Sequence, residues 1–159
     1  MKLRNLDARS VAMLAGAYGI VMVLGALGFQ YLGGVLPCEM CHWQRWGHIA
    51  AGVIGLVVAA ILDKKYAPAL AWMALLAVAA SGAIGAYQAG MEWGWLQGPA
   101  SCSGHAVAFH GLSNLNNEHV VPCDVAQWRL FGLSLAGYNA LCSFAVAGIG
   151  AFLLLWRKA

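Results

Sequence analysis

Four long runs without a charged residue constrain the fold of this chain more than any other feature of its sequence. They cover residues 10–38, 46–62, 66–91 and 130–156. A helix needs about 20 apolar residues, with a range of roughly 17 to 25, to cross the hydrocarbon core of a bilayer. Only 9% of the residues are charged, against about 25% in a typical soluble domain. The sequence therefore argues against a water-soluble fold and predicts an all-α membrane protein.

We expect a four-transmembrane-helix bundle that forms a single integral membrane domain over residues 1–159. The predicted helices span about 10–31, 42–62, 67–91 and 128–156. They leave two connections on one side of the membrane, at about 32–41 and 92–127, of which the second is long. No β-strand is expected. Small residues recur in the first helix, where they would let neighbouring helices approach closely in lipid; these are Gly16, Gly19, Gly25 and Gly28.

The basic residues predict the orientation of the bundle. Seven of the nine flank the helices on one side: Lys2, Arg4, Arg9, Lys64, Lys65, Arg157 and Lys158. By the positive-inside rule this side is cytoplasmic, so both termini are expected in the cytoplasm. The other side holds Arg45 and Arg129. In the inner membrane of a bacterium it would face the periplasm, where disulfides persist.

Four of the five cysteines fall into two pairs, one in each periplasmic connection. Cys38 and Cys41 form a C-x-x-C pair in the first connection, and Cys102 and Cys123 lie in the second. The fifth, Cys142, lies midway along the last helix, where we expect a small apolar packing residue, because free cysteine is among the most buried residue types.

The start of the second helix brings Cys41 together with two cationic or titratable side chains. In a helix, Cys41, Arg45 and His48 fall at i, i+4 and i+7 and share one face. The positive end of the helix dipole and the guanidinium of Arg45 both favour the thiolate of Cys41, which is the reactive form of the thiol. An arginine at membrane depth costs at least about 2.5 kcal/mol unless it is paired, so we expect a thiolate or a ligand oxygen as its partner.

Several chemistries fit the cysteines. Two redox-active disulfides, Cys38–Cys41 and Cys102–Cys123, would exchange through mixed disulfides and pass electrons to a lipid-soluble oxidant at the membrane. Alternatively, Cys38-x-x-Cys41-His42 matches a haem attachment pattern, which would make the chain a membrane-anchored c-type electron carrier but leave the second pair unexplained. A metal site from Cys102-x-x-His105 and purely structural disulfides are the remaining interpretations. We expect no metal site, because cysteines in an oxidising compartment usually pair.

The sequence around the first pair resembles that of the DsbB family, the disulfide bond formation proteins of bacterial inner membranes. The pattern is Pro37-Cys38-x-x-Cys41-x-Trp43-Gln44-Arg45-Trp46. The exit of the third helix is similar at Tyr87, Gly90, Glu92, Gly98-Pro99 and Cys102. The entry to the fourth is similar at Pro122-Cys123-Asp124, Gln127-Trp128 and Gly132-Leu133-Ser134. The resemblance covers nearly the whole chain.

This resemblance implies a thiol:quinone oxidoreductase. It would reoxidise a soluble periplasmic dithiol oxidase of the DsbA type, which has a thioredoxin fold, and pass the electrons to membrane quinone, either ubiquinone or menaquinone. Cys102 matches the position attacked by the partner's thiol, and Cys123 the position that then reacts with Cys38. Cys41 matches the thiolate that faces the quinone, and Arg45 the arginine that supports it.

One position departs from the family pattern. Family members often carry a histidine after the tyrosine at the exit of the third helix, but here Tyr87 is followed by Gln88-Ala89. We therefore take His48 as the second quinone contact beside Arg45, with Gln88 as the alternative.

Overall fold

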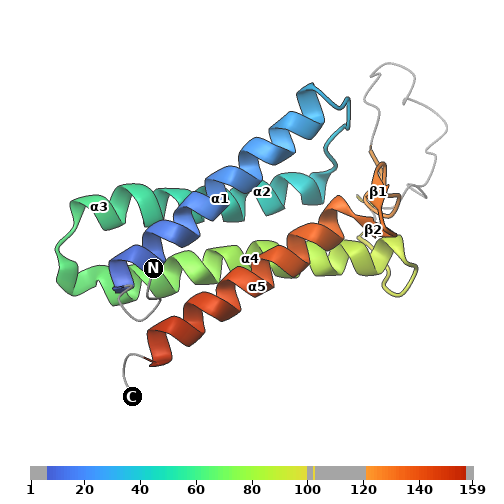
Figure 1. The fold of residues 1–159 in the computed structure, drawn as a ribbon. Helices are drawn as coiled ribbons and strands as arrows, with labels where there is room; N and C mark the ends of the chain where they lie inside the picture. Colours follow the sequence, from blue (N-terminus) through green and yellow to red (C-terminus); the bar gives the residue numbers. More distant parts are fainter. Residues whose placement is uncertain (1–6, 100–101, 103–120, 157–159) are drawn as a thin grey trace.

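Four membrane-length helices form the framework of the computed structural model, which describes residues 7–99, 102 and 121–156 (Figure 1). Each is long and apolar enough to cross a membrane. Their bounds are Ala8–Tyr31, Glu39–Ile61, Lys64–Glu92 and Leu135–Trp156. The expected four-helix membrane architecture is therefore confirmed.

The first span is the single helix α1, Ala8–Tyr31. It begins at Asp7, whose carboxylate accepts hydrogen bonds from the backbone N–H of Ser10 at 2.8 Å and from its hydroxyl at 2.7 Å. Such a side chain satisfies donors that the first turn of a helix leaves unpaired. The helix ends before Gly34, whose positive φ of 68° ends the right-handed path.

The second span begins three residues before its predicted start at 42. It consists of α2 (Glu39–Gly52), the π-helical turn η2 (Val53–Val58) and the short α3 (Ala59–Ile61). The earlier start has a local cause. Cys38 has extended backbone and acts as the N-cap, because its sulfur accepts the backbone N–H of Cys41 at 3.3 Å.

The third span begins with a 3-10 turn, η3 (Lys64–Tyr66), and continues as the main helix α4, Ala67–Glu92. The start of α4 matches the prediction, and its end lies one residue beyond it. A proline in the first turn suits this start, because the first N–H groups of a helix have no intrahelical partner.

The expected start of the last helix at 128 is wrong, and so is the expectation of no strand. Strands β1 (Arg129–Leu130) and β2 (Leu133–Ser134) pair as an antiparallel hairpin. Its two turn residues, Phe131 and Gly132, have φ of 50° and 83°. Positive φ at both positions is typical of a tight hairpin turn and cannot continue a right-handed helix. Helix α5 therefore begins only at Leu135 and runs to Trp156.

The two ends of the bundle differ (Figure 1). The start of α1, the turn between α3 and α4 and the end of α5 lie together at one end. The α1–α2 connection and the hairpin lie at the other. At the first end, the Arg9 guanidinium donates to the backbone carbonyls of Ala59 and Ala60, at 2.6 and 2.5 Å. These bonds tie the start of α1 to the end of the second span.

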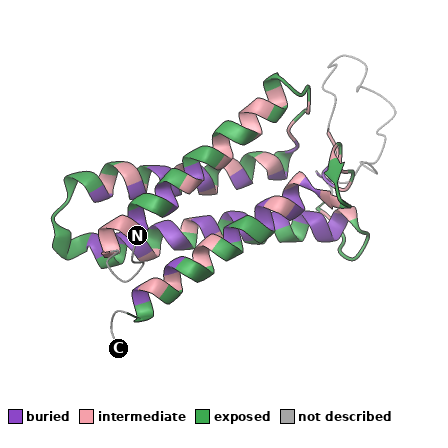
Figure 2. Cartoon of the chain, viewed as in Figure 1, coloured by how far each residue is buried: buried purple, intermediate pink, exposed green. Residues whose placement is uncertain are grey.

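Exposed residues run along the outside of the bundle (green in Figure 2), and many of them are large and apolar. Leu24 is 61% exposed, Leu76 64% and Ile149 62%. A water-soluble protein would bury most such residues, whereas lipid solvates them. The interior is lined instead by small and medium side chains, and the main cluster lies at the end of the bundle where α1 begins and α5 ends. It comprises Val11, Ala12, Ala15, Ala59, Leu70, Ala71, Ala74, Leu75 and Leu154.

Two of the four glycines singled out in α1 are packing residues. A Cβ on Gly16 would lie 2.9 Å from the Cα of Gly55, and one on Gly19 would lie 2.5 Å from the backbone oxygen of His48. Gly25 and Gly28 have nothing within 4 Å of such an atom. Close helix approach in α1 is thus confirmed for the first two glycines and wrong for the last two.

Candidate active site

The fold brings the four paired cysteines of both connections into one cluster. Cys38, Cys102 and Cys123 are buried in it, and Cys41 packs against it. Its remaining members are Met40, Met91, Ile84 and Val121. Residues that are 64 positions apart in the sequence, Cys38 and Cys102, therefore share one apolar environment.

The pairs differ in redox state. Cys102 and Cys123 form the expected disulfide, with their Cα atoms 5.0 Å apart. The backbone supports this bond, because Cys123 N–H donates to the carbonyl of Cys102 at 2.8 Å. Cys38 and Cys41 are free thiols, so the expected Cys38–Cys41 disulfide is not formed in this structure. The cluster thus holds one disulfide beside one dithiol.

Side chains bind the two connections together around the cluster. The amide of Gln127 accepts the N–H of Leu36 at 3.0 Å and donates to its carbonyl at 2.6 Å. It thereby completes a strand-like pair of hydrogen bonds. Arg129 donates to the carbonyl of Glu92 at 3.2 Å, which ties the hairpin to the end of α4.

Cys38 is the more deeply buried of the two thiols, at 4% exposure. The hydrogen bond with the thiol of Cys41 raises the pKa of the Cys38 thiol, and burial raises it further. Cys38 therefore stays protonated at neutral pH when Cys41 is reduced. This environment suits Cys38 to receive a disulfide bond rather than to act first as a nucleophile.

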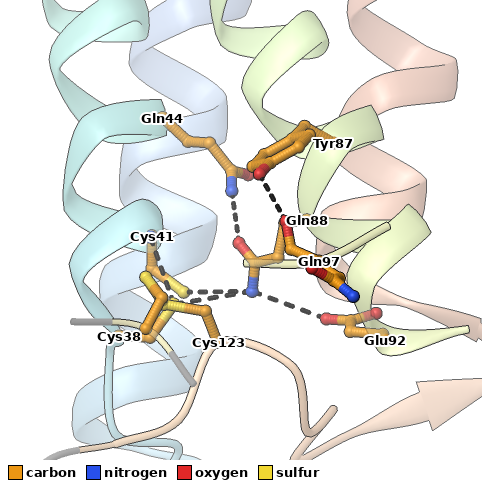
Figure 3. Close-up of a disulfide and its surroundings, with 9 residues drawn as sticks. Cys38, Cys41, Gln44, Tyr87, Gln88, Glu92, Gln97 and Cys123 are labelled. Atoms are coloured by element: carbon orange, nitrogen blue, oxygen red, sulfur yellow. Dashed lines mark hydrogen bonds between the residues drawn. A yellow bond between two sulfur atoms is a disulfide. The ribbon is translucent and has the colours of Figure 1, made fainter. Parts of the chain in front are cut away.

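Gln88 of α4 contacts both thiols (Figure 3). Its amide nitrogen lies 3.5 Å from the sulfur of Cys38, 3.9 Å from that of Cys41 and 3.5 Å from Oε1 of Glu92. Its carbonyl oxygen accepts a hydrogen bond from Nε2 of Gln44 at 2.7 Å. The sequence predicts Gln88 only as an alternative quinone contact and assigns no role to Gln44. The sequence signal that could have indicated this role of Gln88 is its spacing from Glu92, one helical turn further along α4.

A cavity of about 490 Å³ lies directly beside the thiols. This is within the roughly 300 to 1,000 Å³ typical of small-molecule sites. Cys41, Arg45 and His48 all line it, so the predicted face of α2 is confirmed as one wall. Polar residues of other helices also line it: Gln88, Glu92, Tyr138 and Asn139. The remaining lining is mainly apolar and comes from α1, the α1–α2 connection, residues 122–128, the hairpin and α5.

Arg45 is held by α1 rather than by a carboxylate. Its guanidinium donates to Oε1 of Gln30 at 2.6 Å and to the carbonyl of Ala26 at 3.4 Å. Within residues 7–99, 102 and 121–156 it has no ion-pair partner. The positive charge at the cavity wall is therefore not neutralised by the described part of the chain.

His48 is 3% exposed and lies against α1 and α5. Its Nε2 is 2.8 Å from Oδ1 of Asn139, and its ring meets the ring of Tyr18 edge-on at 5.6 Å between centroids. Its other nitrogen, Nδ1, is buried without a hydrogen-bond partner among the described residues. A buried polar atom of this kind needs a partner, and His48 borders the cavity.

Cys142 contradicts its prediction. It is exposed and lines the cavity from α5, so it is not packed in the bundle core. The expectation rested on the burial of free cysteine in general, which does not account for a bundle whose outer surface is apolar.

The metal interpretation joined Cys102 to His105. Cys102 is in a disulfide, and His105 lies outside the described residues. Within those residues no three His, Cys, Asp or Glu side chains are grouped to hold a metal.

A family profile described as disulfide bond formation protein DsbB matches residues 8–153 of this chain. The chain belongs to the DsbB family. Similar curated proteins span all or nearly all of its length. Disulfide bond formation protein B of Polaromonas naphthalenivorans is 27% identical over 100% of this chain and 98% of its own. Disulfide bond formation protein B 1 of Burkholderia lata is 29% identical, over 94% and 89%. No solved structure matches this chain.

Membership in the DsbB family implies disulfide-forming oxidoreductase activity in a multi-pass membrane protein. The cysteine cluster is consistent with that activity, because it holds one disulfide beside one dithiol. The alternative interpretation of Cys38-x-x-Cys41-His42 as a haem attachment site is not supported by these relationships.

Proposed function

We propose that this DsbB-family chain is a thiol:quinone oxidoreductase that reoxidises a soluble dithiol oxidase of the DsbA type. The observation that carries the proposal is the shared cluster of both cysteine pairs beside a cavity lined by residues of the membrane-length helices. In this proposal the Cys102–Cys123 pair receives electrons from a partner outside the membrane. The other borders the space in which a lipid-soluble acceptor would lie.

The relay consists of thiol–disulfide exchanges, in which every bond broken is replaced by one formed. A thiolate of the reduced partner attacks Cys102, which forms a mixed disulfide and releases Cys123 as a thiolate. Cys123 attacks Cys38 of an oxidised Cys38–Cys41 pair and releases Cys41 as a thiolate. The second partner thiol then displaces Cys102, and the free Cys102 resolves the Cys38–Cys123 bridge. The partner leaves oxidised, and Cys38 and Cys41 become the dithiol, as in this structure.

The cavity has the chemistry that a quinone requires. Bound quinone supplies an acceptor for the two electrons and two protons that the Cys38–Cys41 dithiol gives up on forming its disulfide. Arg45 would hold one oxygen of the ring, since its charge is not neutralised within the described residues. His48 would hold another polar group through Nδ1, the buried ring atom that lacks a partner among them. The apolar walls from α1 and α5 exclude water and match a lipid-soluble molecule.

The proposed setting is the bacterial inner membrane, with the cysteine cluster at the periplasmic face and both termini in the cytoplasm. The start of α1, which contains Arg9, and the turn η3, which contains Lys64 and Lys65, lie at the end of the bundle opposite the α1–α2 connection (Figure 1). The positive-inside rule requires this distribution for that orientation.

Quinone reduction by a reduced DsbA-type partner tests this function. Purified protein is mixed with the reduced partner and a soluble quinone, and quinone absorbance is followed. We expect turnover by the wild type and by Cys142→Ser, because Cys142 lines the cavity but belongs to neither pair. We expect Cys102→Ser to lose turnover. Wild-type turnover in Cys102→Ser would contradict the relay.

A further inference from the structure

Three buried amide side chains form a continuous hydrogen-bonded chain from α5 to the thiols. Asn139, Gln44 and Gln88 lie on α5, α2 and α4 and are 5%, 8% and 5% exposed. Nδ2 of Asn139 donates to Oε1 of Gln44 at 2.8 Å, and Nε2 of Gln44 donates to Oε1 of Gln88 at 2.7 Å. Polar side chains at membrane depth are costly and mark functional sites.

A backbone carbonyl fixes the direction of this chain. Nδ2 of Asn139 lies 3.2 Å from the carbonyl oxygen of Ser81, which can only accept a hydrogen bond. The Asn139 amide therefore has its nitrogen on this side. Gln44 must then present its oxygen to Asn139 and its nitrogen to Gln88. By the same reasoning Gln88 presents its carbonyl to Gln44 and its N–H group to the sulfurs of Cys38 and Cys41.

We propose that Gln88 is a positioning residue that holds an N–H donor on the Cys38–Cys41 pair, and that Gln44 and Asn139 fix its direction. The inference rests on the proposed function, because it assigns a task within the thiol pair of that relay. An N–H group placed at the sulfurs stabilises the thiolate that each exchange step releases or consumes. A hydrogen bond to a charged group is strong enough to change a population by a factor of about ten or more.

Simple interhelical adhesion explains these contacts less well. Polar side chains commonly hydrogen-bond across membrane helices, and such bonds serve packing. If the bonds served only to hold helices together, the hydrogen bond between Gln44 of α2 and Gln88 of α4 would be sufficient. Here the last donor of the chain reaches the two sulfurs and one oxygen of Glu92, and no other acceptor for it is present among the described residues.

Two methionine substitutions separate these explanations. Gln88→Met removes the donor at the sulfurs and nearly preserves side-chain length. Gln44→Met does not touch the sulfurs, but it removes the N–H that holds the Gln88 carbonyl and so frees the Gln88 amide to turn. Ser143→Ala is the matched control. It removes a 2.9 Å hydrogen bond to Oδ1 of Asn139 and a 3.0 Å hydrogen bond with the hydroxyl of Tyr18, and it leaves the direction of the chain unchanged.

The readout is the rate at which iodoacetamide alkylates Cys41 near neutral pH, without quinone or partner. It is measured by peptide mass spectrometry on the full chain in detergent. Cys102, Cys123 and Cys142 are replaced by alanine, so that Cys38 and Cys41 stay reduced. Thermal unfolding of each variant is recorded in the same detergent.

We expect Gln88→Met and Gln44→Met to slow alkylation of Cys41 about tenfold, because a hydrogen bond to the thiolate is lost or misdirected. We expect Ser143→Ala to alkylate at the rate of the parent. Unchanged or faster alkylation in Gln44→Met would overturn the proposal, since loosened packing exposes the thiol and accelerates the reaction. The quinone assay tests the relay independently. Absence of quinone turnover by the wild type would refute the relay. Normal turnover by the wild type, together with an unchanged alkylation rate in the two methionine variants, would refute only the role of Gln88.

Discussion

Gly19 gives the sharpest test of how α1 packs on α2. A Cβ at this position would lie 2.5 Å from the backbone oxygen of His48 and 3.3 Å from the Cβ of Ala51. The first distance is roughly 0.9 Å short of the 3.4 Å at which ordinary contact begins. Because the obstructing atom belongs to the backbone of a helix, no side-chain rotation relieves the clash, and α2 itself must move.

The expected cost follows from two opposing terms. Overpacking a close-packed interior costs about 1 to 3 kcal/mol. Replacing glycine by alanine in a helix interior returns up to about 1 kcal/mol. Gly28→Ala is the matched control, because Gly28 lies in the same helix and a Cβ there would meet nothing within 4 Å. The helix-propensity gain is common to both, so Gly19→Ala should be less stable than Gly28→Ala by about 1 to 3 kcal/mol.

Unfolding of both variants in mixed micelles with increasing denaturing detergent, followed by tryptophan fluorescence, gives this difference. Movement of the His48 backbone would also lengthen the 2.8 Å contact between His48 Nε2 and Asn139. Equal stability of Gly19→Ala and Gly28→Ala would refute the described α1–α2 contact.

Two further predictions concern the cysteine pair and the amide chain. The hydrogen bond with the thiol of Cys41, and then burial, raise the pKa of Cys38, so at a given pH a smaller fraction of Cys38 is thiolate. In the reduced protein the rate of Cys38 alkylation should therefore be low at neutral pH and increase as the pH becomes alkaline. Cys41→Ala removes the largest cause and should speed alkylation of Cys38 at neutral pH, and an unchanged rate would contradict this explanation. Asn139→Leu should destabilise the protein more than Ser143→Ala. It removes hydrogen bonds to His48, Gln44, Ser143 and to both the carbonyl and the hydroxyl of Ser81, whereas Ser143→Ala removes those to Asn139 and Tyr18. At an average of about 0.6 kcal/mol for each hydrogen bond in a membrane, the difference should exceed about 1 kcal/mol in the same unfolding assay.

The helices were predictable because each depends on a local property of the sequence. Long charge-free runs fixed the number of spans, and the third helix was placed to within one residue at each end. The last helix was not, because the turn at Phe131 and Gly132 lies inside an apolar run, where hydropathy does not distinguish a hairpin from a helix. The start of the second span depended on a sulfur acting as an N-cap, which is an unusual role for cysteine.

The site was predictable on one helix and less so between helices. Spacing placed Cys41, Arg45 and His48 on one face of α2, and all three border the cavity. The partners of these residues come from other helices, and their positions depend on how the helices pack. Gln30 and Asn139 are examples, since single-sequence periodicity carries no information about which residues of α1 and α5 face α2.

The most direct test of the central claim is a disulfide map of Cys41→Ala. In this variant Cys38 has lost its C-x-x-C partner and lies beside the Cys102–Cys123 disulfide. Its thiolate can attack Cys123, forming a Cys38–Cys123 bond and releasing Cys102 as a thiolate, with no added oxidant. Peptide mass spectrometry under non-reducing conditions, before any partner is added, should detect the Cys38–Cys123 bond together with a free thiol at Cys102. A map that contains only Cys102–Cys123, with Cys38 free, would contradict the proposed exchange between the two connections.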